Sequence, residues 1–259
     1  MLSRFVIAAF VVSCFAAPAG AQAPSAKAAA AAAGKPVAMK PAKAGNAAAP
    51  ESGPCHIGVI PIVGNLFRVE KFELPFGDRL TQVATEGWAL DELVVSRVRA
   101  AAHGNSVRRI PFTAEELIRD AQQRPISLFN TEDVRIKEFA QDIAGRIRCE
   151  RYVVVHRRGF SSKESGIGIS IHFKAAFLFA MTQIRIYDGR SFNLIKQGPA
   201  LIDESTAFSG SPGGPSRVVD LSALPDKLSD AAASPVLRDG VRALLTASLD
   251  KTLPMMLRP

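Results

Sequence analysis

Hydrophobic and polar residues follow two different periods along residues 54–259, and both periods recur several times. Short apolar or alternating runs are typical of strands, whereas apolar residues spaced three and four positions apart are typical of helices. The pattern predicts strands at residues 57–62, 66–72, 79–84, 106–110, 151–156 and 192–195. It predicts helices at residues 89–102, 225–233 and 235–253, with two more starting near residues 113 and 131.

Local capping chemistry marks the start of one of these helices. Thr113 and Glu116 form a capping box, and Phe112 and Leu117 occupy the two positions of a hydrophobic staple. Residues 54–259 are numerous enough for one domain with a full core. The order of elements predicts an α/β fold, a single three-layer-like domain in which helices flank one mixed sheet.

The first 21 residues have the pattern of a secretory signal peptide. Arg4 precedes an apolar run, and Ala19 and Ala21 flank a glycine as in an A-x-A cleavage site, so we expect the mature chain to start at Gln22. An alternative is that Cys14, which ends the lipobox-like run Val-Val-Ser-Cys, carries a lipid. The protein is therefore predicted to be periplasmic or secreted, and anchored to the outer membrane if Cys14 is lipidated.

Residues 22–53 consist mainly of alanine, proline, glycine and lysine, and they contain no aromatic residue. Such a segment has too few large apolar side chains to offset the entropy lost on ordering, so we interpret it as a disordered tether. The formal net charge of the chain is +8, but the net charge of residues 54–259 is only +4. A mildly basic domain on an exported chain argues against nucleic acid as a partner.

Two cysteines, Cys55 and Cys149, lie in residues 54–259, each just before a predicted strand. An even number of cysteines in an oxidising compartment favours one disulfide. If the two strands are parallel neighbours, their starts lie about 4.8 Å apart, which suits the Cα separation of roughly 5.5 Å in a disulfide. The sequence therefore predicts a Cys55–Cys149 bond.

The sequence shows no recognisable catalytic, metal or cofactor motif. It contains neither a G-x-S-x-G elbow nor an H-E-x-x-H helix, and none of its four histidines has another four positions away. His156, on a predicted strand beside two arginines, is the histidine worth testing as a catalytic base, although a structural role is the simpler interpretation. We interpret Asp188 as turn chemistry because Gly189 follows it, and we predict no cofactor.

A small basic cluster follows that same strand. Arg157, Arg158 and Lys163 lie close together in the sequence, beside Phe160. Clusters of this kind are commonly solvated surface, but they also attract anionic polymers and acidic partners. These three residues are the candidate binding site for an envelope protein or an anionic envelope polymer.

Three segments carry a resemblance to a known group of exported domains: residues 57–62, the helix end at 140–148 running into 151–155, and residues 182–190. The chain resembles the group of the curli-secretion lipoprotein, the lipoprotein activator of penicillin-binding proteins and the amino-terminal domain of the Tol-Pal propeller protein. The resemblance implies a tethered α/β domain that docks on a partner. It does not extend to a membrane pore, because His172 and Lys174 interrupt the one stretch that is apolar enough.

These observations lead to one main functional hypothesis, an exported non-enzymatic protein that binds or scaffolds another component of the cell envelope. A periplasmic hydrolase with a site near His156 and a carrier of a small ligand are the alternatives. The sequence leaves the partner and the oligomeric state open.

Overall fold

The computed structural model describes residues 53–64, 66–73, 77–125, 131–158, 166–172, 174–202 and 215–258. The predicted signal peptide, nearly all of the predicted tether, Cys14 and Lys163 lie outside these residues. Among the described helices, none combines the length and hydrophobicity needed to cross a membrane.

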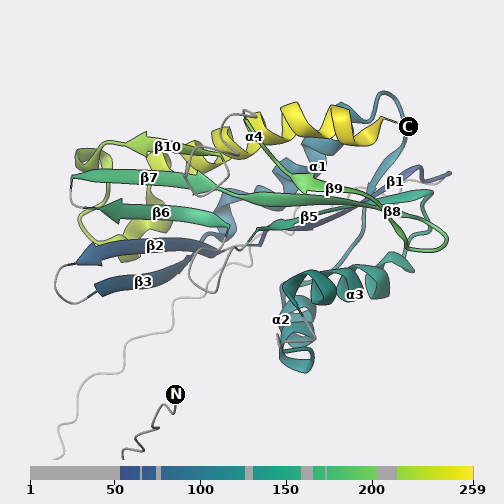
Figure 1. Ribbon diagram of the computed structural model, residues 1–259, viewed down its shortest axis with the longest axis horizontal. Coiled ribbons are helices and arrows are strands. Elements are labelled where there is room, and N and C mark those ends of the chain that lie inside the picture. Colours follow the sequence, from purple (N-terminus) through teal and green to yellow (C-terminus); the bar gives the residue numbers. More distant parts are fainter. Residues whose placement is uncertain are drawn as a thin grey trace, which may run out of the picture. The chain divides into compact units, whose positions relative to one another are not determined.

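The described strands form two five-stranded mixed sheets (Figure 1). The first sheet has the order β4-β1-β5-β8-β9 and the second the order β10-β7-β6-β2-β3. The strands of the first sheet are β1 (Ile57–Ile62), β4 (Val107–Arg109), β5 (Arg151–Arg157), β8 (Thr182–Asp188) and β9 (Leu194–Pro199). Those of the second are β2 (Leu66–Glu73), β3 (Gly77–Ala84), β6 (Ile167–His172), β7 (Ala175–Ala180) and β10 (Ser216–Val219).

The described part of the chain contains four α-helices. They are α1 (Leu90–Ala101), α2 (Ala114–Gln123), α3 (Glu132–Ala144) and α4 (Pro235–Leu257), with short 3-10 segments at Glu86–Trp88, Leu221–Ala223 and Leu228–Ala233. Helices α1 and α4 lie on one side of the first sheet and α3 lies on the other, with α2 next to it (Figure 1). Helix α4 also contacts β7 of the second sheet.

The alternation of side chains along β5 explains the layers. Val153 and Val155 point into a core shared with α1, α4 and the second sheet, whereas Tyr152 and Val154 point into a second core shared with α3. Successive strand residues face opposite sides of a sheet, so a strand that is apolar at every position is buried on both faces. The α/β class and the helix–sheet–helix layering predicted from the sequence are confirmed.

The number of sheets differs from the prediction of one mixed sheet. After β1 the chain turns at Gly64, which has a φ of +71°, and then enters the second sheet as β2. Glycine adopts such a positive φ without steric cost. An alternating pattern shows that a segment is a strand but not which strand it will pair with, and β2 pairs with the distant β6.

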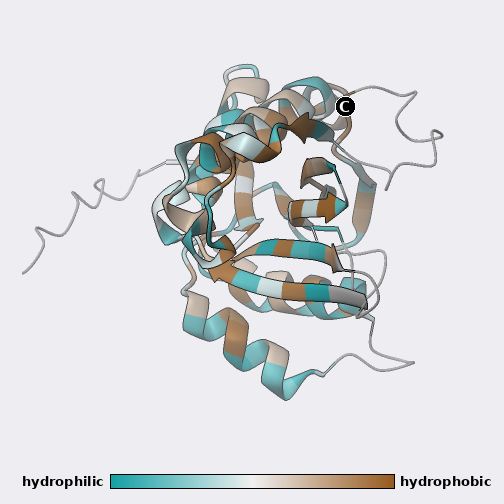
Figure 2. Cartoon of the chain, turned by 90° about the vertical axis from the view of Figure 1, so that its left-hand side faces the viewer, coloured by the Kyte–Doolittle hydropathy of each residue, from teal (hydrophilic) through white to brown (hydrophobic). Residues whose placement is uncertain are grey.

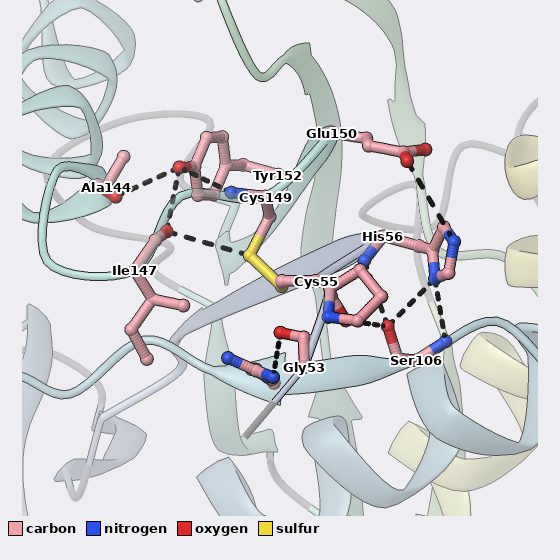
Figure 3. The surroundings of a disulfide bond; sticks show 11 residues. Gly53, Cys55, His56, Ser106, Ala144, Ile147, Cys149, Glu150 and Tyr152 are labelled. Atoms are coloured by element: carbon pink, nitrogen blue, oxygen red, sulfur yellow. Dashed lines mark hydrogen bonds and ion pairs between the residues drawn. A yellow bond between two sulfur atoms is a disulfide. The ribbon is translucent and has the colours of Figure 1, made fainter. Parts of the chain in front are cut away.

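The disulfide between Cys55 and Cys149 is confirmed, with a Cα–Cα distance of 4.5 Å. The two strands that follow these cysteines are parallel neighbours, with Ile57 paired to Arg151. Figure 3 shows how Tyr152 supports the bond from the α3 side: its hydroxyl donates to the Ile147 carbonyl oxygen (2.9 Å) and accepts from the Cys149 N–H (3.2 Å).

Candidate functional site

An open groove of about 720 Å³ lies at the carboxyl ends of β1 and β5. The chain leaves β1 and returns on one side as β4, then crosses to the other side as β5, and all three strands are parallel. In open α/β sheets ligands bind where the chain direction switches in this way, because the two connections separate and leave a crevice. Side chains of α1, α2 and α3 surround this groove.

The wall formed by α2 is apolar. Ala114, Leu117, Ile118 and Ala121 all line the groove, and their spacing places them on one face of the helix. Ile118 is 57% exposed, and the only residue of α2 that is fully buried is Asp120. In Figure 2, α2 is the lowest helix and carries hydrophobic residues in its middle with hydrophilic residues around them. The apolar face of α2 thus borders an open groove.

Contacts at its first turn hold α2 in place. The Thr113 hydroxyl accepts from the Glu116 N–H (3.2 Å), and the Glu116 carboxylate accepts from the Thr113 N–H (2.9 Å), which confirms the capping box. Arg146 donates to the same carboxylate (2.7 Å) and to the Pro111 carbonyl oxygen (2.6 Å). The hydrogen bonds from Arg146 and from the Thr113 backbone lower the pKa of Glu116 to about 2.

The opposite wall carries charged residues from α1 and the end of β4. The Asp91 carboxylate accepts from the Gly64 N–H (3.3 Å) and lies 3.7 Å from Arg109. Arg109 also donates to the Glu92 carboxylate at 2.7 Å. Burial raises the pKa of Asp91, and the nearby Arg109 guanidinium opposes that shift.

Arg157, the last residue of β5, lines the groove beside the turn from β1 into β2. Its guanidinium donates to the carbonyl oxygens of Val63 and Leu66, the residues on either side of the turn from β1 into β2. Burial lowers the pKa of Arg157 to about 10, and the nearby carboxylates of Asp91 and Glu132 oppose the shift. Arg157 is therefore charged at neutral pH and occupied by backbone acceptors.

His156 lines the same groove but is only 2% exposed. Its Nδ1 lies 2.8 Å from the Arg157 carbonyl oxygen. A carbonyl oxygen only accepts, so Nδ1 carries the proton and Nε2 is a buried acceptor, for which the structure shows no partner. Burial and the Arg185 charge lower the pKa of His156 to about 4, which keeps the ring neutral at pH 7.

The structure brings only part of the predicted basic cluster to the groove. Arg157 lines it, Arg158 does not, and Lys163 lies outside the described residues. Within the described part of the chain, no hydrogen bond links His156 to a hydroxyl or thiol, and no group of three or more acidic, histidine or cysteine side chains is suited to hold a metal ion.

The sequence interpretation missed the α2 face and Glu132 as site residues. The spacing of Ala114, Leu117, Ile118 and Ala121 was visible as a helical stripe, but such stripes usually face a core. Glu132 was visible as an acidic residue in a first helical turn, where acids are common because they complement the helix dipole. Only the tertiary arrangement places both on one groove.

No family model and no curated protein matches this sequence. Solved structures with a related arrangement include lipoprotein GNA1162 from Neisseria meningitidis, at 14% identity over 72% of this chain and 97% of that chain, with a TM-score of 0.28. Protein XCC0632 from Xanthomonas campestris is 12% identical over 82% of this chain and 88% of its own, with a TM-score of 0.37. The LpoB carboxy-terminal domain from Salmonella enterica is 13% identical over 58% and 84%, with a TM-score of 0.23.

The first of these structures is described as a lipoprotein. Their low identities and TM-scores assign this chain to no particular group.

Proposed function

We propose that this chain is an exported, non-enzymatic protein of the cell envelope that binds a segment of another envelope protein in the groove between α1, α2 and α3. The observation that carries the proposal is the apolar face of α2, which lines an open groove and leaves Ile118 57% exposed. Hydrophobic area left exposed beside a concave surface is typical of a binding site.

The shape of the groove supports a peptide segment as the occupant. In one recurring mode of recognition, an amphipathic helical segment lays its apolar face in a hydrophobic groove. The groove volume of about 720 Å³ is within the usual range for ligand sites, and the groove is open to solvent. Such an open groove can admit a segment of a longer partner chain.

An anionic polymer, the other partner considered from the sequence, is less well supported. The first turns of all three helices around the groove already carry acidic residues: Asp91, Glu92, Glu115, Glu116, Glu132 and Asp133. Acids at these positions complement the positive ends of the helix dipoles and repel a further anion. We therefore propose a protein segment.

A hydrolytic centre at His156 is also less well supported. The ring is buried, and its pKa of about 4 lies far from neutral pH, whereas an efficient general base has a pKa near the working pH.

Photocrosslinking in the native host tests the proposed function. A photoreactive amino acid at Ile118 should give one defined adduct with an envelope protein, identified by mass spectrometry. The control places the same amino acid at Met255, which is 51% exposed on α4 and does not line the groove. An added Ala114→Glu substitution should remove the adduct at position 118, because it puts a charge on the apolar wall. Equal labelling from the two positions, or an adduct unaffected by Ala114→Glu, would contradict the proposal.

A further inference from the structure

The charges lining the groove differ in how well they are compensated. Asp91 and Glu92 interact with Arg109, and Arg157 donates to two backbone carbonyl oxygens. Glu132, the first residue of α3, also lines the groove. Among the described residues, no hydrogen bond or ion pair within 4.0 Å reaches its carboxylate. Its carboxylate is therefore open to a partner's cation, unlike those of Asp91 and Glu92.

The nearest cations do not fully compensate Glu132. Arg135, Arg157 and Arg185 each act to lower its pKa, yet burial outweighs them and the pKa of Glu132 is raised. Arg135 is itself shared, since its charge also acts on the buried Asp120. A partly buried carboxylate with a raised pKa gains from a further positive charge at hydrogen-bond distance.

The residues that line the groove carry one more negative than positive charge, although the chain is basic. Four carboxylate residues and three arginines line the groove, while the whole chain has a net charge of +8. His156 adds no charge because its ring is neutral. Local charge of opposite sign to the rest of the molecule favours a cationic occupant and disfavours an anionic one.

We infer that the occupant of this groove is a protein segment in which a lysine or arginine stands beside an apolar side chain, and that the Glu132 carboxylate receives the cation. The apolar side chain packs on Leu117 and Ile118 of α2, and the cation lies against the start of α3. This inference rests on the proposed function and adds the chemistry of the partner to it.

The inference is tested with three short peptides and the full mature chain. The peptides are acetylated and amidated and have the sequence Gly-Ser-Leu-X-Leu-Ser-Gly, with X as lysine, glutamine or glutamate. Binding is measured by competition against a labelled copy of the lysine peptide at low salt. We expect the lysine peptide to bind roughly tenfold more tightly than the glutamine peptide, as one charge-assisted hydrogen bond provides. The glutamate peptide should bind most weakly.

Two matched variants identify the residue responsible. Glu132→Gln should abolish the preference for lysine over glutamine. Glu115→Gln, which changes an acid in the first turn of α2 that does not line the groove, should preserve it. Ile118→Glu tests the apolar contact and should weaken the glutamine peptide as well.

The outcomes separate the inference from the function on which it rests. If the lysine and glutamine peptides bind equally and Ile118→Glu weakens both, the cation site is overturned. Docking in the groove would still be supported. A lysine preference that survives Glu132→Gln also overturns the cation site. Absence of binding by the lysine peptide up to about 1 mM, the weakest affinity of interest, overturns the inference, while the Ile118 crosslink decides the function independently.

Discussion

Side chains at the end of β5 have structural roles that the neighbouring sequence did not indicate. Arg157 was expected to be a binding residue because it belongs to a basic run, but its guanidinium connects the carbonyl oxygens of Val63 and Leu66 where the chain passes between the sheets. Buried carbonyl oxygens require a donor, and a planar guanidinium with several N–H groups can serve two of them at once. Arg157 therefore holds the turn between β1 and β2, and its role in binding stays a prediction.

The neighbouring His156 should make stability depend on pH. Its pKa is about 4 in the folded protein against 6.5 for the unperturbed group, so the unfolded chain binds more protons between these values. The free energy of unfolding is therefore unaffected by the titration of this ring above pH 6.5, and it decreases as the pH falls from 6.5 toward 4. The full effect is on the order of 3 kcal/mol. The groups acting on the ring are Arg185, Arg135 and Asp133.

Urea unfolding at several pH values measures this effect. His156→Gln should reduce the loss of stability between pH 6.5 and 4, whereas His172→Gln, at an exposed histidine of β6, should keep it. Identical pH profiles for the wild type and His156→Gln would show that the ring is not held neutral.

At the scale of elements, α2 is the least buried of the four α-helices, and its cap should matter more than usual. Thr113→Ala removes the hydroxyl that accepts from the Glu116 N–H and should destabilise α2 by about 1 kcal/mol. Since α2 buries only Asp120 completely, little packing is available to resist local opening. Amide exchange should therefore accelerate across residues 114–123.

The matched substitution is Thr131→Ala in α3. Thr131 caps that helix by accepting from the Val134 N–H (3.4 Å), but α3 buries Ile136, Phe139, Ala140 and Ile143 in the core. Residues 132–144 should consequently stay protected from exchange. Equal acceleration in both helices would mean that α2 is packed as firmly as α3, contrary to the groove described above.

Much of the element pattern was predictable because it depends on neighbouring residues. The strand at 57–62 and the Thr113–Glu116 cap follow from local chemistry, and both are confirmed. The strand predicted at 192–195 is instead β9 at Leu194–Pro199, because Phe192 has a φ of +54° and stacks on Tyr187 at 4.6 Å between ring centroids. The pairing of β2 with β6 and the groove beside α2 depend on contacts between distant segments, which no local pattern encodes.

The disulfide acts on the folding of a large part of the domain. It joins residues separated by 94 positions, so in the chain-entropy model it stabilises the folded state by up to about 4.7 kcal/mol. The double variant Cys55→Ser, Cys149→Ser should unfold at a correspondingly lower urea concentration. Adding reductant should lower the midpoint of the wild type and leave that of the variant unchanged. A wild type insensitive to reductant in urea would contradict the bond.

At the scale of the whole molecule, the first 21 residues and the disulfide make one joint prediction, because both depend on export. The pair Cys55–Cys149 forms readily only in an oxidising compartment, to which a signal peptide would deliver the chain. Cleavage after Ala21 would leave the tether free at Gln22, whereas a lipid on Cys14 would hold the same tether at a membrane.

Intact mass spectrometry of the protein purified from its native host distinguishes these arrangements. We expect a mass equal to residues 22–259 less two hydrogen atoms, with the two hydrogens regained on reduction. A mass that corresponds to a chain starting at Cys14 with added acyl groups would show a lipid anchor instead of cleavage after Ala21. The groove proposal would be unchanged. A chain that retains residues 1–21, with Cys55 and Cys149 as free thiols, would contradict export, and with it the proposal that the partner is an envelope protein.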